Sequence, residues 1–127
     1  MDKKAELKLM QVLQNNPAHP LVIAGESDIR LENFVSLDAG IDERELHLPT
    51  HWHKLLETKS KSKKAYLIIS GLDSIDAARQ EIFASLLKDR RAGNFKLPDN
   101  VQIVVPVADK SKLSRRILSL ALVWDIA

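Results

Sequence analysis

The sequence contains no cysteine, and this absence excludes several kinds of site at once. Without thiols the chain has no disulfide framework, no thiolate zinc site and no cysteine nucleophile. Its four glycines and five prolines form no biased tract of the kind that indicates disorder. The composition therefore predicts a globular protein in a reducing compartment.

Long apolar runs are missing as well. The longest, Ile117 to Trp124, is too short to cross a bilayer, and Met1 to Met10 lacks the apolar stretch of a signal peptide. We therefore expect a cytoplasmic protein. A length of 127 residues corresponds to one domain, so residues 1–127 are expected to form a single unit.

Charge is distributed unevenly along the chain. Residues 1–58 carry a net charge of −4 and residues 59–127 carry +6, which gives the total of +2. A basic half of this kind raises the hypothesis of a polyanionic partner, although such charges are also found on the solvated faces of helices.

Short apolar runs alternate with segments of helical periodicity. Continuous apolar runs of this length are typical of buried parallel strands. Strands are predicted at 21–24, 45–48, 65–69, 101–105 and 121–126, and helices at 5–13, 31–37, 52–56, 75–87 and 113–118. We expect Asp73 to cap the helix after the third strand. The alternation predicts an α/β fold, a three-layer arrangement of a parallel sheet with helices on both faces.

Two segments in the middle of the chain resemble a known family. Leu67 to Asp73, followed by an amphipathic helix, and then Asp89 to Val104 are similar to the central stretch of AAA+ ATPases, with the MoxR-like and midasin-like branches nearest. In that family the first segment is the Walker B strand and the second leads to the sensor-1 strand. The resemblance implies a P-loop NTPase-like fold.

The phosphate-binding loop of this family does not survive at the matching place. Such a loop requires glycines, a lysine for the terminal phosphates and a Ser/Thr hydroxyl for Mg²⁺. Here only Gly25 is kept, Arg30 replaces the second glycine, Leu31 the lysine and Glu32 the hydroxyl. Retained phosphate binding through Arg30 is the weaker alternative. We expect no bound nucleotide or other cofactor.

The catalytic carboxylates are missing too. Ser70 and Gly71 stand where the family has the metal-organising Asp and the water-orienting Glu. Asp109 lies near the sensor-1 position, and Arg115 and Arg116 lie near the arginine fingers, where we interpret all three as surface residues. The family's helical lid has no counterpart before Ala127. The resemblance implies a degenerate core without catalytic residues.

The main functional hypothesis is a non-catalytic binding or scaffold module that contacts a protein partner, either an active AAA+ ATPase or a second copy. The alternative is a small nucleic-acid-binding accessory protein. Its candidate interaction patch would lie at the amino edge of the sheet, and Arg115 and Arg116 near the opposite edge. The patch consists of Lys59, Lys61, Lys63, Lys64, Arg90, Arg91 and Lys96. Phe95 is the one aromatic residue available for stacking beside it.

Two further hypotheses remain open. His51 and His53 form a close pair, but residues two apart on a helix point to different faces, so we interpret them as surface histidines rather than metal ligands. An enzyme of another type would require a polar pocket near Gly25, Ser70 and Asp109. No nucleophile elbow supports it.

Overall fold

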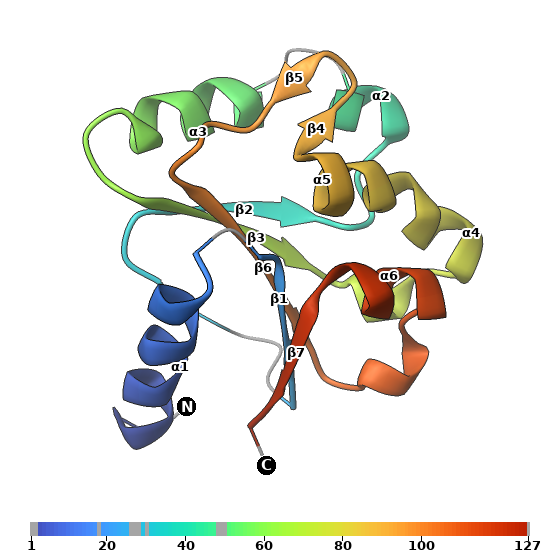
Figure 1. Ribbon diagram of the computed structural model, residues 1–127. Coiled ribbons are helices and arrows are strands. Elements are labelled where there is room, and N and C mark those ends of the chain that lie inside the picture. Colours follow the sequence, from blue (N-terminus) through green and yellow to red (C-terminus); the bar gives the residue numbers. More distant parts are fainter. Residues whose placement is uncertain (1–2, 18, 26–28, 30, 48–50, 127) are drawn as a thin grey trace.

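A five-stranded parallel sheet forms the centre of the protein (Figure 1). The computed structural model describes residues 3–17, 19–25, 29, 31–47 and 51–126. The strands are β1 (Leu21–Ala24), β2 (Phe34–Asp38), β3 (Ala65–Ser70), β6 (Val101–Val107) and β7 (Leu122–Asp125), in the order β2-β3-β6-β1-β7. A short hairpin, β4 (Arg91–Ala92) with β5 (Phe95–Lys96), stands apart from the sheet. The predicted α/β fold is confirmed.

Helices cover both faces of the sheet, but unequally (Figure 1). One face carries α1 (Lys3–Asn15), and the other carries α2 (Glu43–His47), α3 (His51–Ser60), α4 (Ala77–Gln80), α5 (Ala84–Asp89) and α6 (Arg115–Leu120). The described residues also form three single 3₁₀ turns: η1 (Leu72–Ser74), η2 (Glu81–Phe83) and η3 (Lys110–Lys112). None of the described helices is long and apolar enough to cross a membrane.

This imbalance follows from the handedness of the connections. From β2 to β3 to β6 the chain steps in one direction across the sheet, and it continues in that direction from β6 to β7. Only the connection from β1 to β2 runs the opposite way. Because crossovers between parallel strands are right-handed, that one connection must pass over the opposite face. It shares this face with α1.

Two apolar clusters correspond to the two faces. The larger joins alternate sheet residues such as Leu67 and Val105 to Leu56, Phe83 and Ile117 of the helices. The smaller joins the remaining sheet residues to Leu9 and Leu13 of α1 and to Ile29 and Leu31 of the β1–β2 connection. The alternation along each strand thus places its side chains in two separate cores.

Residues 34–37, predicted as part of a helix, form β2 instead. Val35 and Leu37 are buried, whereas Ser36 and Asp38 are exposed. This two-residue alternation is that of a strand, and Leu31, Phe34 and Val35 match helical spacing only by coincidence. The helix prediction was therefore wrong.

The strand predicted from Glu45 was also wrong, because the segment is α2. Asp42 caps this helix: its Oδ1 accepts the Arg44 backbone N–H at 2.8 Å, and its carbonyl accepts that of Leu46 at 3.0 Å. Asp42 and Glu45 have the spacing of a capping box, a signal that outweighs four residues of apparent alternation. Leu48, the last residue of the predicted strand, lies outside the described residues.

The remaining elements are confirmed with small shifts of their ends. Lys59 and Ser60 belong to the last turn of α3, so the connection from α3 to β3 spans residues 61–64. The long helix predicted at 75–87 is α4, η2 and α5 in succession. Gln80 is buried within it, and its Nε2 donates to the carbonyls of Ile75 and Lys112 at 3.0 and 2.9 Å.

The turn of the β4–β5 hairpin presses on the end of α2. Gly93 has a φ of +62°, and a Cβ built on it would lie 2.5 Å from the carbonyl oxygen of His47. Both the conformation and the space therefore require glycine.

Replacement of Gly93 by alanine should destabilise the protein by roughly 2–4 kcal/mol, because strain at positive φ and a steric clash add. Gly71→Ala is the matched control, since Gly71 has a φ of +80° but no atom closer than 3.8 Å to a built Cβ. It should cost only about 1 kcal/mol. Urea unfolding of both variants measures the difference, and equal losses would show that the contact with His47 is unimportant.

Candidate interaction surface

At the carboxyl edge of the sheet, Asp73 links the turn after β3 to the end of β6. Its Oδ2 accepts the backbone N–H groups of Ala108 and Asp109, at 3.0 and 3.3 Å. Asp73 lies in η1 and does not cap the following helix. That cap is Asp76, whose Oδ1 accepts the Arg79 N–H at 2.9 Å. The predicted role of Asp73 was therefore wrong, because the helix begins three residues later than expected.

The other polar residues of this edge also have local partners. Asp109 caps η3, and its Oδ1 accepts from the Ser111 hydroxyl at 2.6 Å and from the Ser111 N–H at 3.0 Å. These two hydrogen bonds lower the pKa of Asp109. Arg116 pairs with Glu81 at 3.3 Å, whereas Arg115 is exposed. The described residues include no group of three or more His, Asp or Glu side chains able to hold a metal ion.

The connection from β1 to β2 contains the segment predicted to correspond to the phosphate loop. It begins at Gly25, whose φ is +101°, and of its residues the structure describes Gly25, Ile29 and Leu31–Asn33, none of which is helical. Ile29 and Leu31 are 6% and 8% exposed and pack in the smaller apolar cluster. Leu31, predicted to stand at the position of the phosphate-binding lysine, therefore faces the core. Arg30 lies outside the described residues.

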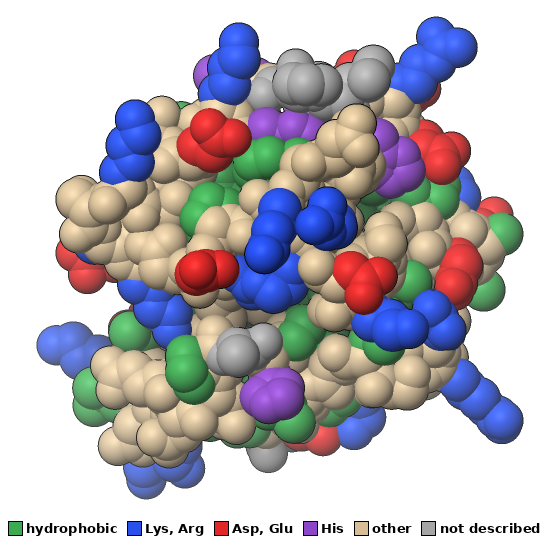
Figure 2. All heavy atoms as spheres, turned by 45° about the horizontal axis from the view of Figure 1, so that its top comes forward, with side chains coloured by type: hydrophobic (Ala, Val, Ile, Leu, Met, Phe, Trp, Pro, Cys, Tyr) green, Lys and Arg blue, Asp and Glu red, His purple; other side chains and the backbone are tan. Residues whose placement is uncertain are grey.

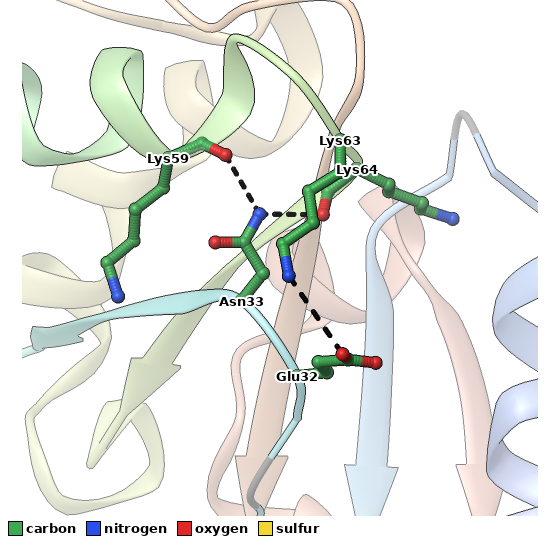
Figure 3. Close-up of polar contacts among 5 residues, drawn as sticks. All are labelled: Glu32, Asn33, Lys59, Lys63 and Lys64. Carbon is green, nitrogen blue, oxygen red and sulfur yellow. Dashed lines mark hydrogen bonds and ion pairs between the residues drawn. The ribbon is translucent and has the colours of Figure 1, made fainter.

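The lysine loop, residues 61–64 together with Lys59 and Ser60 of the last turn of α3, lies at the amino edge of the sheet, as predicted. The side chains of Asn33 and Asn100 fix its backbone, and Figure 3 shows the contacts of Asn33. Asn33 Nδ2 donates to the carbonyls of Lys59 and Lys64, at 2.8 and 2.9 Å. Asn100 Nδ2 donates to those of Ser60 and Lys63, at 2.6 and 3.0 Å. Both asparagines directly precede a strand, Asn33 before β2 and Asn100 before β6, a signal that was not used in the sequence-based predictions.

The lysine side chains of this loop differ in their surroundings. Lys63 Nζ approaches Glu32 at 3.9 Å, and both side chains are largely exposed (Figure 3). Lys64 Nζ lies 5.2 Å from the ring centre of Tyr66, and partial burial lowers the pKa of this amine. A shallow pocket of about 230 Å³ lies beside them. It is lined by Met10, Glu32, Asn33, Lys63, Lys64 and Tyr66.

The arginines of the predicted patch have unequal roles. Arg90 ends α5 with a φ of 58°, and its Nη2 donates to the Pro98 carbonyl at 2.7 Å. Burial lowers the pKa of its guanidinium, with Asp99 opposing this effect. Arg91 and Lys96 face each other across the hairpin and are exposed. Arg90 therefore supports the hairpin, and only its neighbours are free to contact a partner.

The surface above the hairpin and α3 is of mixed charge. Figure 2 shows Lys and Arg side chains there in separate groups, with Asp and Glu side chains between them. Lys61, Lys63, Arg91 and Lys96 are exposed, whereas Lys59 and Lys64 are half-buried. The amino edge carries basic groups but no continuous basic field on this face.

His53 is buried, which corrects its interpretation as a surface histidine. It is 2% exposed, its ring stacks on Phe95 at 4.2 Å, and its Nε2 lies 3.1 Å from the Leu46 carbonyl. Nδ1 has no hydrogen-bond partner among the described residues. The error arose because α3 turns His53 toward α2 and the hairpin. The same stacking occupies Phe95, the aromatic residue proposed for nucleic-acid binding, whereas His51 is exposed.

Acidification should destabilise the protein through His53. Burial holds the pKa of this imidazole below its ordinary value of 6.5, so the unfolded chain binds the proton more readily. The stabilisation is complete above pH 6.5 and is lost as the pH falls below it. His53→Leu should lower the unfolding free energy near neutral pH and flatten its dependence between about pH 7 and pH 5. His51→Gln is the control, and urea titrations that leave the slope unchanged in His53→Leu would refute the assignment.

The order of the parallel strands, the right-handed crossovers and the helices on both faces define an α/β fold like the P-loop core of AAA+ ATPases. Among solved structures, a point mutant of RuvB from Thermotoga maritima, an AAA+ ATPase, is similar with a TM-score of 0.62 at 12% identity. The match covers 98% of this chain and 45% of that one. No protein-family model and no curated sequence matches. The likeness establishes the fold alone.

Proposed function

We propose that the protein is a non-catalytic, AAA+-like module that acts through protein–protein contacts. The observation that carries the proposal is the burial of Leu31. An active phosphate loop holds a lysine amine at this position toward the nucleotide, in a loop followed by a helix. Here the side chain is apolar, 8% exposed and packed in the core that α1 shares with the sheet.

The carboxyl edge supports the same proposal. Ser70 and Gly71 offer no carboxylate for Mg²⁺ or for a general base. Asp73, two residues further on, uses Oδ2 to accept two backbone N–H groups. Turning it toward a metal ion would leave both N–H groups without this partner, which costs free energy. A structural role therefore accounts for Asp73. Asp38, which lies opposite Ser70 on β2, likewise uses its Oδ1 to accept the Gly40 N–H at 2.8 Å.

Nucleotide binding is the direct test. Mg²⁺–ATP and ADP at about 1 mM should give no heat in calorimetry and no change in melting temperature. A ligand with a dissociation constant near 10 µM would stabilise the fold by about 2.7 kcal/mol at that concentration, a shift of several degrees. An active AAA+ ATPase measured under the same conditions is the positive control. Saturable micromolar binding would contradict the proposal.

Asp73→Asn separates the structural from the catalytic interpretation. The amide keeps one acceptor oxygen but loses the charge, so the unfolding free energy should fall by about 1–2 kcal/mol. Nucleotide binding should stay undetectable in both proteins. Tight nucleotide binding by the unaltered chain that Asp73→Asn abolishes would instead assign Asp73 to a metal site and favour an enzyme of another type.

Nucleic-acid binding is the alternative function, favoured by the exposed Lys61, Lys63, Arg91 and Lys96 near the amino edge. Three features weigh against it. The Lys63 amine lies near Glu32, the Arg90 guanidinium donates to the Pro98 carbonyl, and the Phe95 ring is stacked on His53. The remaining cations would bind nucleic acid weakly and in a salt-dependent manner.

Fluorescence anisotropy with labelled single-stranded DNA and RNA tests this alternative. We expect no binding at about 150 mM salt, and at most weak binding at about 50 mM that disappears as salt rises. Lys61→Glu combined with Arg91→Glu forms the patch variant. Lys112→Glu with Arg115→Glu is the matched control, because these exposed cations lie toward the carboxyl edge. Tight binding abolished only in the patch variant would replace the proposed function.

A further inference from the structure

The outer edge of β7 is open in the part of the chain that the structure describes. β7 is the last strand of the sheet, and among the described strands it pairs only with β1. The N–H groups of Leu122 and Ile126 donate to the carbonyls of Pro20 and Ala24, at 2.9 and 3.0 Å. Because backbone groups alternate in direction along a strand, those of Val123 and Asp125 point away from β1. They form an unused row of donors and acceptors.

The exposed side chains of Leu122 and Val123 at this edge are apolar, although an unpaired edge is usually protected from strand pairing by charged side chains or prolines. Leu122 and Val123 are each 40% exposed. The charge of Asp125 is balanced within the chain, because its carboxylate accepts from Lys110 Nζ at 2.7 Å. Sheet edges that must not pair carry unbalanced charges, prolines or bulges, and β7 has none of these. It is an edge that is suited to pairing.

The opposite edge of the same sheet provides an internal comparison. β2 is also a terminal strand, but its exposed residues, Ser36 and Asp38, are polar. A charge of this kind at an edge discourages pairing with another strand. Any partner strand should therefore select β7 rather than β2.

We propose that a second copy of the chain pairs with the outer edge of β7, antiparallel and about a two-fold axis at Val123. This inference rests on the proposed role in protein–protein contacts and names the partner. Two identical edges related by a two-fold axis can only run antiparallel, which makes the interface isologous. The backbone groups of Val123 then bond to those of Val123 in the second copy, and the sheet continues from one copy into the other.

The side chains of β7 are complementary to themselves in this register. The Val123 side chain lies opposite Val123 of the second copy, on the face of the sheet that carries α6. Leu122 meets Trp124 of the second copy on the face that carries α1, where Trp124 is half-buried. Asp125 falls opposite Ala121, so no two like charges face each other. A self-complementary apolar strand with its charge already paired favours a second copy over a charged peptide.

The absence of cysteine makes a direct test possible, since one introduced thiol is the only one. Val123→Cys is compared with Ser36→Cys, which places an exposed thiol on the β2 edge. Facing hydrogen-bonded residues of antiparallel strands have Cα atoms about 5.5 Å apart, within disulfide range. Under mild oxidation Val123→Cys should form a disulfide dimer at least about tenfold faster than Ser36→Cys. Equal rates would overturn the inference.

Sedimentation of the unaltered chain is the second measurement. We expect a concentration-dependent dimer that persists from about 50 to about 500 mM salt, because its contacts are apolar and backbone hydrogen bonds. Val123→Lys should be monomeric, and Ser36→Lys should dimerise like the unaltered chain. If Val123→Lys melts markedly lower, the cysteine comparison decides alone.

The two proposals fail in different experiments. A monomer at all concentrations, with equal cysteine reactivities, overturns the β7 interface but leaves the module free to contact a different protein. Micromolar nucleotide binding overturns the non-catalytic module whether or not β7 pairs. A dimer that dissociates in salt and is unaffected by Val123→Lys would place the interface elsewhere and overturn the inference.

Discussion

The right-handed crossover rule governs the asymmetry of this fold. Every connection but one moves across the sheet in the same direction, so all of their helices gather on one face. The β1–β2 connection is forced onto the other face, where α1 is its neighbour. It extends only from Gly25 to Asn33, so it covers the sheet with single side chains such as Ile29 and Leu31. An apolar residue at position 31 is therefore required for packing.

Buried amide side chains connect helices and loops that the hydrogen bonds of the sheet do not hold together. Gln102 on β6 donates to the carbonyls of Asn16 and His19, at 2.8 and 3.2 Å, which ties the end of α1 to the sheet. Gln80 accepts the Ser114 N–H at 2.7 Å and so links α4 to the start of α6. Each amide satisfies backbone groups that an apolar side chain would leave unpaired. In this protein the loops are positioned by hydrogen bonds between a side chain and the backbone of a residue distant in sequence.

Much of the fold could be predicted from the sequence, because continuous apolar runs such as 65–69 and 101–105 identify buried strands without ambiguity. Errors fell on short segments near the β2 edge, where residues 34–37 satisfy two periodicities and the cap at Asp42 was overlooked. The candidate surface was predicted less well. Its lysines are evident in the sequence, but the burial of His53 and the internal use of Arg90 depend on how α3 packs against the hairpin, which no local pattern encodes. The degenerate phosphate loop, the cytoplasmic location and the protein partner stay predictions.

At the amino and carboxyl edges of the sheet, backbone polar groups are hydrogen-bonded to side chains of the same protein, and this restricts where a partner can bind. At the amino edge the carbonyls of the lysine loop are bound by Asn33 and Asn100, and at the carboxyl edge the N–H groups after β6 are bound by Asp73. A partner at either edge would therefore contact mainly side chains, because these backbone groups already have hydrogen-bond partners within the protein. The outer edge of β7 differs, because its directed backbone groups still lack partners among the described residues. Since unpaired backbone groups give both affinity and register, recognition by this module is expected to be directional along a strand rather than through a charged patch.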